Sequence, residues 1–319
     1  MSVNLDKPHL WKNDVIASVD LYNRWFLNFA PQAYRDKRSE TSGTVEDVFS
    51  ITSNMADISC SILKDNPQIL PILRMSTVPP IARDRLIGLA GVSPSLVKNM
   101  EEDGRLPPRM RSDIIDVEMQ KVSTILTRML DRDIFNWLDT NEPPTEIDLT
   151  RSAAVIADRL CGMMSDPIIR NAQEQRQLAA IRSWLEARGY THIPNGTGIV
   201  YNEMLPGTFA FRLNMPVSLE DGKNVNIPVD TVIMPLTASA GDFPLLIEAK
   251  SAGDFTNTNK RRKEEAVKMS QLRANYGEQV RFILFLCGYF DTGYLGYEAA
   301  EGIDWVWEHR IDDLAAFGV

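Results

Sequence analysis

Apolar residues recur at helical spacing through the first half of the chain. In DVIASVDLYNRWFLNFAPQAY, residues 14–34, the apolar positions fall on one side of a helix that we expect to stop at Pro31. Residues 44–70 and 111–138 repeat this pattern. We therefore predict a mostly helical region over residues 1–150, bounded by the turn-forming sequence TNEPPTEIDLT.

The pattern changes in residues 151–319, where apolar runs of strand length follow a helix. This helix is expected to begin with Asp166 as N-cap and Pro167 in its first turn, and to end at Gly189. Alternating and continuous apolar runs then predict strands at 208–215, 225–234 and 244–250, a helix at 259–276 and a strand at 280–287.

The order helix, three strands, helix, strand predicts an α/β (α+β) fold with a mixed sheet flanked by helices. Trp305 and Trp307 alternate as they would in a further strand, and we expect them in the core rather than stacked on bases.

Composition and charge exclude several classes of protein. Of the 319 residues, 44% are hydrophobic and 24% charged, as in globular domains. We find neither a membrane-spanning run nor a secretion signal at the start, which predicts a cytoplasmic location. The net charge of −9 disfavours a nucleic-acid binder with a uniformly basic surface but allows a local basic groove. Disulfide or zinc spacing is not found among the scattered thiols and imidazoles: Cys60, Cys161, Cys287, His9, His192 and His309.

Candidate chemistry begins where the strand at 244–250 ends, in the sequence PLLIEAKSAGDF. Glu248 and Lys250 point to the same face, because residues two apart in a strand do so. Asp230 lies in the preceding strand among apolar neighbours, where a buried carboxylate needs a partner. Glu174 lies on the apolar stripe of the helix before the sheet. The plainer alternatives are a solvated strand end for Glu248 and Lys250, and a surface ion pair with Arg170 for Glu174.

Three carboxylates and a lysine beside a sheet suit a hard divalent cation. Mg²⁺ prefers oxygen ligands and is often held by one or two carboxylates together with substrate phosphate. Such an ion activates water and stabilises a leaving oxygen, and a lysine offsets charge on the phosphoryl group. The set predicts hydrolysis of a phosphodiester.

Pro228-Val229-Asp230 followed by Glu248-Ala249-Lys250 resembles the motif of the PD-(D/E)xK nuclease superfamily, with Val229 inserted between proline and aspartate. A wider similarity, in PPIARDRLIGLAGVS, IEAKSAGDFTNTNKRRKEE and GYLGYEAAEGIDWVWEHRIDDL, is to XamI-type type II restriction endonucleases. The resemblance implies an αβββαβ core over residues 151–319, Mg²⁺ dependence and a homodimer. It also implies cleavage of double-stranded DNA at a short palindrome such as GTCGAC, and a cognate DNA methyltransferase.

Carried over residue by residue, the resemblance assigns roles in catalysis. It makes Asp230 and Glu248 metal ligands and Lys250 the catalytic lysine. Glu174 would be an additional acidic ligand from the first helix of the core.

A second signal lies near residues 83–104, in RLIGLAGVSPSLVKNMEEDGRLP. Gly91 and the apolar residues after it resemble the turn and second helix of a helix-turn-helix, which would expose Ser95, Lys98 and Asn99 to DNA. The alternative is an ordinary pair of helices joined at Gly91.

The basic run Lys260–Lys263 falls in the first turn of the helix expected at 259–276, where the helix dipole disfavours cations. We therefore expect it to meet an anion, the DNA backbone, unless it is simply a solvated helix start. The predicted DNA-contacting residues here are Ser251, Asn257, Thr258, Asn259, Lys260, Arg261 and Arg262.

The favoured interpretation is a Mg²⁺-dependent, sequence-specific endonuclease. The alternatives are a noncatalytic helix-turn-helix regulator, which has no need of the carboxylates and lysine together, and a nuclease of the same superfamily acting in DNA repair.

Overall fold

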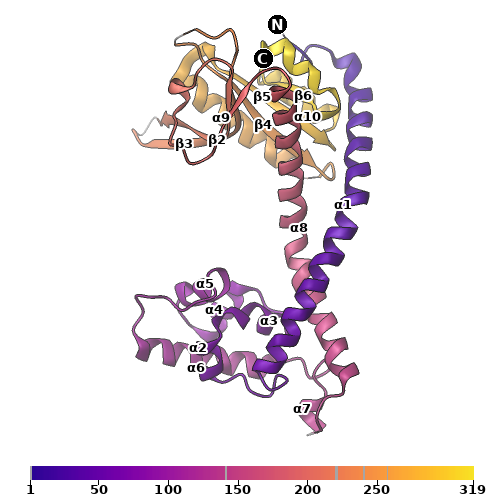
Figure 1. The fold of residues 1–319 in the computed structure, drawn as a ribbon, viewed down its shortest axis with the longest axis vertical. Coiled ribbons are helices and arrows are strands. Elements are labelled where there is room, and N and C mark those ends of the chain that lie inside the picture. Colours follow the sequence, from indigo (N-terminus) through magenta and orange to yellow (C-terminus); the bar gives the residue numbers. More distant parts are fainter. Residues whose placement is uncertain (1, 141, 220–221, 240, 257) are drawn as a thin grey trace. The chain divides into compact units, whose positions relative to one another are not determined.

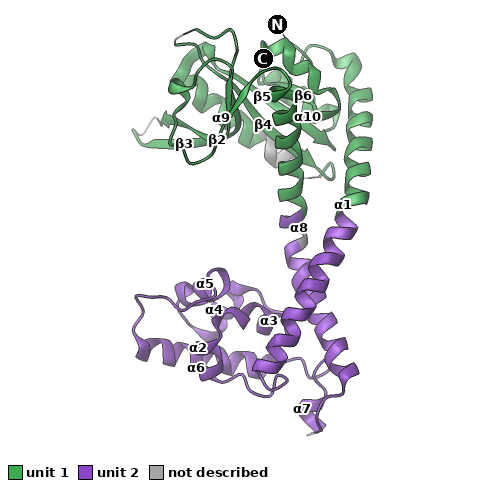
Figure 2. Cartoon of the chain, viewed as in Figure 1, with its two compact units in different colours: residues 1–29, 169–319 green, residues 30–168 purple. Residues whose placement is uncertain are grey.

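The computed structural model describes residues 2–140, 142–219, 222–239, 241–256 and 258–319 (Figure 1). The chain forms two compact units, one of residues 1–29 and 169–319 and the other of residues 30–168 (Figure 2). The division differs from the single boundary near residue 150 that the sequence suggested. Residues 1–29 belong to the unit with the sheet. The other boundary between the units, between residues 168 and 169, falls inside a helix.

Both predicted helix boundaries at proline are wrong. Helix α1 (Pro8–Ile51) continues through Pro31, and α8 (Glu146–Glu186) continues through Pro167. Helix α8 begins where Thr145 and Asp148 bind each other: the Thr145 N–H donates to the Asp148 carboxylate, and the Asp148 N–H donates to the Thr145 hydroxyl. This reciprocal cap satisfies free N–H groups at the helix start. A proline inside a helix costs about 3 kcal/mol, which long helices with buried faces tolerate.

The unit of residues 30–168 is helical, as predicted, and its core is apolar. Helices α4 (Arg83–Ala90) and α5 (Pro94–Glu102) are joined at Gly91, whose φ of 59° is in the left-handed region that favours glycine. The remaining helices of this unit are α2 (Cys60–Asp65), η1 (Pro67–Ile69), α3 (Leu70–Met75), α6 (Ser112–Met129) and α7 (Trp137–Thr140).

The other unit contains a six-stranded mixed sheet in the order β1-β2-β3-β4-β5-β6. Strands β2, β3 and β4 are antiparallel, whereas β1 runs parallel to β2, and β4, β5 and β6 are parallel to one another. The predicted strands and the helix between them are confirmed within a few residues. The elements are β1 (Thr191–Ile193), η2 (Tyr201–Glu203), β2 (Thr208–Ser218), β3 (Asn224–Met234), β4 (Leu245–Ala252), α9 (Thr258–Tyr276), η3 (Gly277–Gln279), β5 (Arg281–Gly288), α10 (Thr292–Ala300), β6 (Asp304–Trp307) and η4 (Glu308–Phe317).

Helices cover both faces of the sheet, as the order of elements predicted. On one face, Ile181 and Leu185 of α8 pack with alternate residues of the strands such as Leu245 and Ile247. On the other, Met269 and Leu272 of α9 pack with Leu246 and Leu284, and with the fully buried Trp305 and Trp307.

The described part of the chain has no helix with the length and apolar character needed to cross a membrane. All three cysteines are free, as their spacing predicted.

Candidate active site

A cavity of about 250 Å³ brings the predicted catalytic residues together. Its wall is formed by α8, β3, β4 and the first turns of α9. The described lining residues are Arg170, Gln173, Glu174, Gln177, Asp230, Glu248, Ala249, Lys250, Ser251 and Glu264. Residues separated by as many as 94 positions in the chain, Arg170 and Glu264, thus share one cavity.

The cavity lies where β3 and β4 separate. Their pairing ends at Thr231 and Ile247, while β4 stays paired with β5 as far as Ala252. Beyond that point the Ala249 N–H donates to the Asp230 carboxylate at 2.8 Å instead of to a backbone carbonyl. The Asp230 side chain therefore replaces a missing link of the sheet and holds the strands at a fixed separation.

Glu248 is almost fully buried, which excludes the solvated strand end considered from the sequence. Its Oε1 accepts hydrogen bonds from Lys250 Nζ at 2.9 Å and from Lys268 Nζ at 2.6 Å. Its other oxygen, Oε2, is buried and has no hydrogen-bond partner in the described part of the protein. A buried carboxylate oxygen without a partner is costly, so this atom is suited to an incoming cation.

A carboxylate that sequence reasoning missed, Glu265 of α9, holds Lys250 from the opposite side. The Lys250 Nζ lies 3.2 Å from the Glu265 Oε1, and the Glu265 side chain is fully buried. The signal was present in the sequence, because Glu265 lies on the same helical stripe as Met269 and Leu272.

These charges decide the protonation of Lys250. Burial by itself lowers the pKa of a lysine, but the carboxylates of Glu248 and Glu265 outweigh it and raise the pKa of Lys250 above its ordinary value. Lys250 is therefore an ammonium group at neutral pH, able to donate hydrogen bonds to an anion but not to remove a proton.

Asp230 is shifted in the direction of the neutral acid. Burial, followed by the nearby charge of Glu248, raises the pKa of Asp230 to about 6, although the Ala249 N–H and the two lysines act against this. A divalent cation beside Asp230 would favour the ionised form of this carboxyl group.

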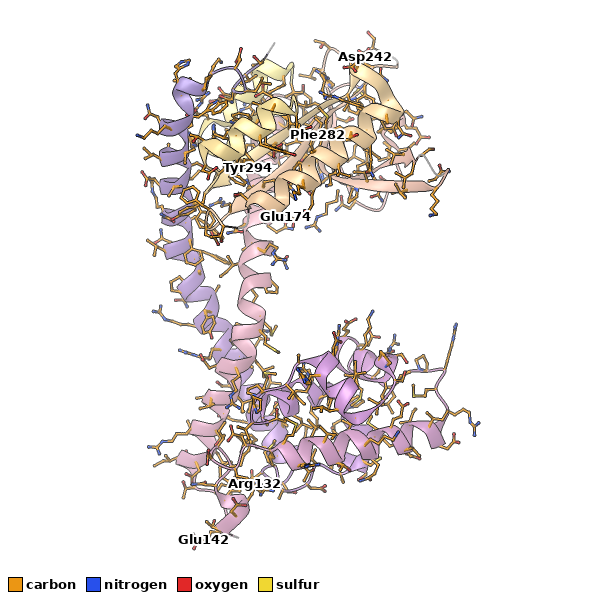
Figure 3. All side chains as sticks on the ribbon, turned by 180° about the vertical axis from the view of Figure 1, so that it is seen from behind. Arg132, Glu142, Glu174, Asp242, Phe282 and Tyr294 are labelled. Atoms are coloured by element: carbon orange, nitrogen blue, oxygen red, sulfur yellow. The ribbon has the colours of Figure 1, made fainter. Side chains whose placement is uncertain are left out.

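Glu174 enters the cavity from α8, near the point where this helix reaches the sheet (Figure 3). Its Oε1 accepts two hydrogen bonds from the Arg212 guanidinium, from Nε at 3.0 Å and from Nη2. The ion pair between Glu174 and Arg170 that was considered from the sequence is therefore wrong. Arg212 lies within β2 with a φ of 52°, and such strain in a non-glycine residue is often found at functional sites.

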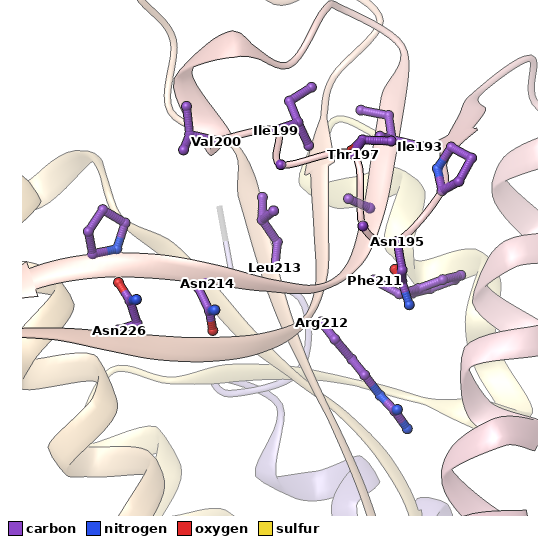
Figure 4. A pocket seen from close by; sticks show the side chains of 15 residues that line it. Ile193, Asn195, Thr197, Ile199, Val200, Phe211, Arg212, Leu213, Asn214 and Asn226 are labelled. Atoms are coloured by element: carbon purple, nitrogen blue, oxygen red, sulfur yellow. The ribbon is translucent and has the colours of Figure 1, made fainter.

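Arg212 also lines a larger cavity of about 530 Å³ beside β2, together with Asn195, Asn214 and Asn226 (Figure 4). In this view Arg212 extends away from Leu213 and Asn214. The described lining of the larger cavity contains no carboxylate, so it offers no acidic ligand for a cation.

Gln177 of α8 was also missed by sequence reasoning. Its Nε2 donates to the backbone carbonyls of Lys250 and Phe285, both at 3.2 Å. This amide ties α8 to β4 and β5 and holds the backbone at the base of the Lys250 side chain. An isolated glutamine on a helix carries no signal of such a role.

Of the three carboxylates predicted to hold a metal ion, only two lie opposite each other. Among the described residues, no three His, Cys, Asp or Glu side chains are grouped as in a preformed metal centre. Asp230 and Glu248 face each other across the opening between β3 and β4, whereas Glu174 is engaged by Arg212. The pair nevertheless fits Mg²⁺, which often takes one or two carboxylates and completes its shell with water and phosphate.

The predicted DNA-contacting residues have mixed outcomes. Ser251 lines the cavity. Thr258 is buried and its hydroxyl donates to the Phe255 carbonyl, so its side chain does not fit a DNA contact in this structure. Asn257 lies outside the described residues. Asn259, Lys260, Arg261 and Arg262 lie in the first turn of α9, but their side chains are outside the described part of the protein.

Two helices joined at Gly91 are present, as both interpretations of this segment predicted, and the helix-turn-helix role remains a prediction. Ser95 and Lys98 are exposed, while Asn99 is half-buried and donates to the Ser95 carbonyl at 2.9 Å. The Lys98 ammonium lies 3.7 Å from the carboxylate of Glu102.

Comparison with known proteins gives two matches. The sequence profile of the XamI restriction endonuclease family matches residues 53–307. The chain is also 57% identical over 316 residues to a protein described as "Type II restriction enzyme SalI" from Streptomyces albus G, with 99% of each chain covered. No solved structure was found to match.

Proposed function

Because this chain belongs to the XamI restriction endonuclease family and is a type II restriction enzyme, we propose that the cavity between β3 and β4 is its active site. The enzyme cuts DNA at a specific sequence, which removes the noncatalytic regulator as an alternative. The proposal rests on one observation: Asp230, Glu248 and Lys250 line a single cavity at the place where two strands separate. The mixed sheet with α8 and α9 on its faces suits a PD-(D/E)xK core.

We assign the metal to Asp230 and Glu248 and take Mg²⁺ as the ion. Glu248 has a buried oxygen without a partner, and Asp230 has a carboxyl group whose ionisation a cation would favour. When bound, Mg²⁺ would supply an activated water and stabilisation of the leaving oxygen.

The protein's own groups would act by position and charge. The Lys250 ammonium would donate to the phosphoryl oxygens or orient the attacking water, and Glu265 keeps it charged and in place. Gln177 limits the movement of the Lys250 backbone. Charge that is organised before the reaction needs no reorganisation during it, which is the usual source of large rate effects.

The DNA sequence that the enzyme recognises is part of the same proposal. The resemblance to XamI-type enzymes implies double-stranded DNA with a palindrome such as GTCGAC, a homodimer that cuts both strands, and a cognate DNA methyltransferase. A cytoplasmic location follows from a DNA substrate inside the cell. Ser251, residues 257 and 259–262 before and in the first turn of α9, and Lys98 and Asn99 of α5 remain the candidate DNA contacts.

The proposal is tested by incubating the purified protein with plasmid DNA carrying a single GTCGAC sequence, with Mg²⁺ and with EDTA. We expect one linear product with Mg²⁺ and intact plasmid with EDTA. A plasmid in which this sequence is scrambled is the matched control. Cleavage in EDTA would contradict the metal assignment, and equal cleavage of both plasmids would contradict the palindrome.

Glu174→Gln tests whether Glu174 supports the metal site. The variant keeps the shape and one oxygen for Arg212 but loses the charge facing the cavity. We expect cleavage to fall about ten- to a hundredfold, the usual range for groups that support a metal site, with the melting temperature nearly unchanged. Glu278→Gln, at an exposed position of the same unit, is the control. Full activity in Glu174→Gln would leave Glu174 as a structural partner of Arg212 only.

A further inference from the structure

Glu248, the proposed metal ligand, is contacted by two positively charged groups. A single oxygen, Oε1, accepts from two ammonium groups, Lys250 at 2.9 Å and Lys268 at 2.6 Å. Lys268 comes from α9, three residues after Glu265 and therefore on the same side of the helix. Its only other hydrogen bond in the described structure is to the Pro228 carbonyl at 3.2 Å.

The charges of the cluster nearly balance without a metal ion. Two lysines, Lys250 and Lys268, face the carboxyl groups of Glu248, Glu265 and Asp230, so two positive charges meet three acidic groups. A divalent cation placed on Asp230 and Glu248 would be close to both ammonium groups. Like charges so close together repel each other, even when screened as near a protein surface.

Lys268 is the lysine that can leave. Lys250 keeps a second carboxylate, Glu265, when Glu248 turns to another cation. Lys268 has no carboxylate but Glu248 among the described residues, and its side chain is 24% exposed compared with 18% for Lys250. A long lysine side chain at the edge of a cavity reaches solvent by rotation about its own bonds.

We propose that Lys268 is an internal competitor of the metal. In the metal-free enzyme it occupies Glu248 and neutralises it, and it gives up this carboxylate when the ion binds. The displaced ammonium then pairs with a phosphate of the DNA, the anion that arrives at the same cavity. Metal and DNA consequently strengthen each other's binding, because such coupling is reciprocal. The inference rests on the proposed function of the cavity and makes Lys268 a further active-site residue.

The role of Lys268 can be tested through metal affinity, independently of cleavage activity. Removing the Lys268 charge should make the DNA-free enzyme bind metal more tightly, whereas loss of a merely structural lysine would leave metal binding unchanged or weaken it. It should also reduce the gain in metal affinity that DNA provides.

The experiment is calorimetric titration of the full-length protein with Ca²⁺, used as a metal that does not support cleavage, without and with a cognate duplex. For Lys268→Met, which keeps the apolar stem, we expect Ca²⁺ affinity without DNA to rise at least about fivefold, the lower end of typical coupling between sites. The duplex should then improve Ca²⁺ binding far less than in wild type. Lys268→Arg keeps the charge and should resemble wild type. Lys121→Met, at an exposed lysine of the helical unit, controls for net charge.

The outcomes separate this inference from the assignment of the site. If Lys268→Met does not keep the wild-type circular dichroism and melting curve, Lys268→Gln takes its place. A folded charge-removing variant with unchanged or weaker Ca²⁺ affinity overturns the competitor role. If wild type binds no Ca²⁺ even with duplex, or if Asp230→Asn binds it normally, the proposed metal site itself is wrong and the inference fails with it.

Discussion

Lys250→Met is expected to lower the rate of plasmid cleavage about a hundred- to a thousandfold, the range seen when one organised donor to a developing charge is removed. Binding of a cognate duplex in Ca²⁺ should change little, because the lysine acts on the phosphoryl group and water rather than on bases. Methionine keeps most of the buried stem, so the loss reports on the ammonium group. The measurements are single-turnover cleavage and a binding titration.

The effect should be specific to this lysine. Lys121→Met removes a positive charge from an exposed position in the other unit and should cleave normally. The Lys250 variant also leaves Glu265 buried without its cation, so its stability must be measured separately. A folded Lys250→Met protein with near-normal cleavage would end the catalytic assignment.

Asp230→Asn should abolish detectable metal binding at the concentrations that saturate wild type, and cleavage with it. The asparagine oxygen can still accept from the Ala249 N–H, so the separation of β3 and β4 is kept, while the charge that binds the ion is lost. Calorimetry with Ca²⁺ and duplex measures the first effect and plasmid cleavage the second. Glu278→Gln, which removes a negative charge from an exposed position, should behave as wild type.

The same variant has an opposite effect on the metal-free protein. The pKa of Asp230 is about 6 in the folded state and 3.8 ordinarily, so the folded state holds this proton more tightly than the unfolded chain does. Wild type therefore loses stability as pH rises from about 4 to about 6, and the deficit persists above that window. In EDTA at about pH 8, Asp230→Asn should be more stable to urea by about 1–3 kcal/mol, and the difference should shrink towards pH 4. An equal difference at both pH values would contradict the shifted pKa.

Local patterns were a sound guide to the sheet. The strands that become β2, β3, β4 and β5 were predicted because their apolar residues alternate or run continuously, and this reflects burial on one or both faces. Prolines misled in both long helices, because a proline removes only one helical hydrogen bond. Burial of the helix faces outweighs that loss, and α8 also has the reciprocal cap at Thr145 and Asp148.

The candidate site, too, could be predicted from the sequence only in part. That Glu248 and Lys250 share a face follows from the two-residue period of a strand and needs no tertiary information. The partner of Glu174 could not be predicted, since Arg212 lies far away in the sequence and meets it only because β2 runs beside α8. Arg170 was the predicted partner because it lies one helical turn before Glu174.

What the sequence determined by itself was therefore the set of candidate groups and the elements that carry them, because propensity, spacing and period are properties of short segments. Only the tertiary structure decided which charges meet: Glu265 and Lys268 of α9 against Lys250 and Glu248 of β4, and Asp230 against the Ala249 N–H. Such contacts depend on the point at which β3 and β4 separate and on the rotation of α9 over the sheet. Both are set by packing of the whole core, and no local stretch of sequence contains them.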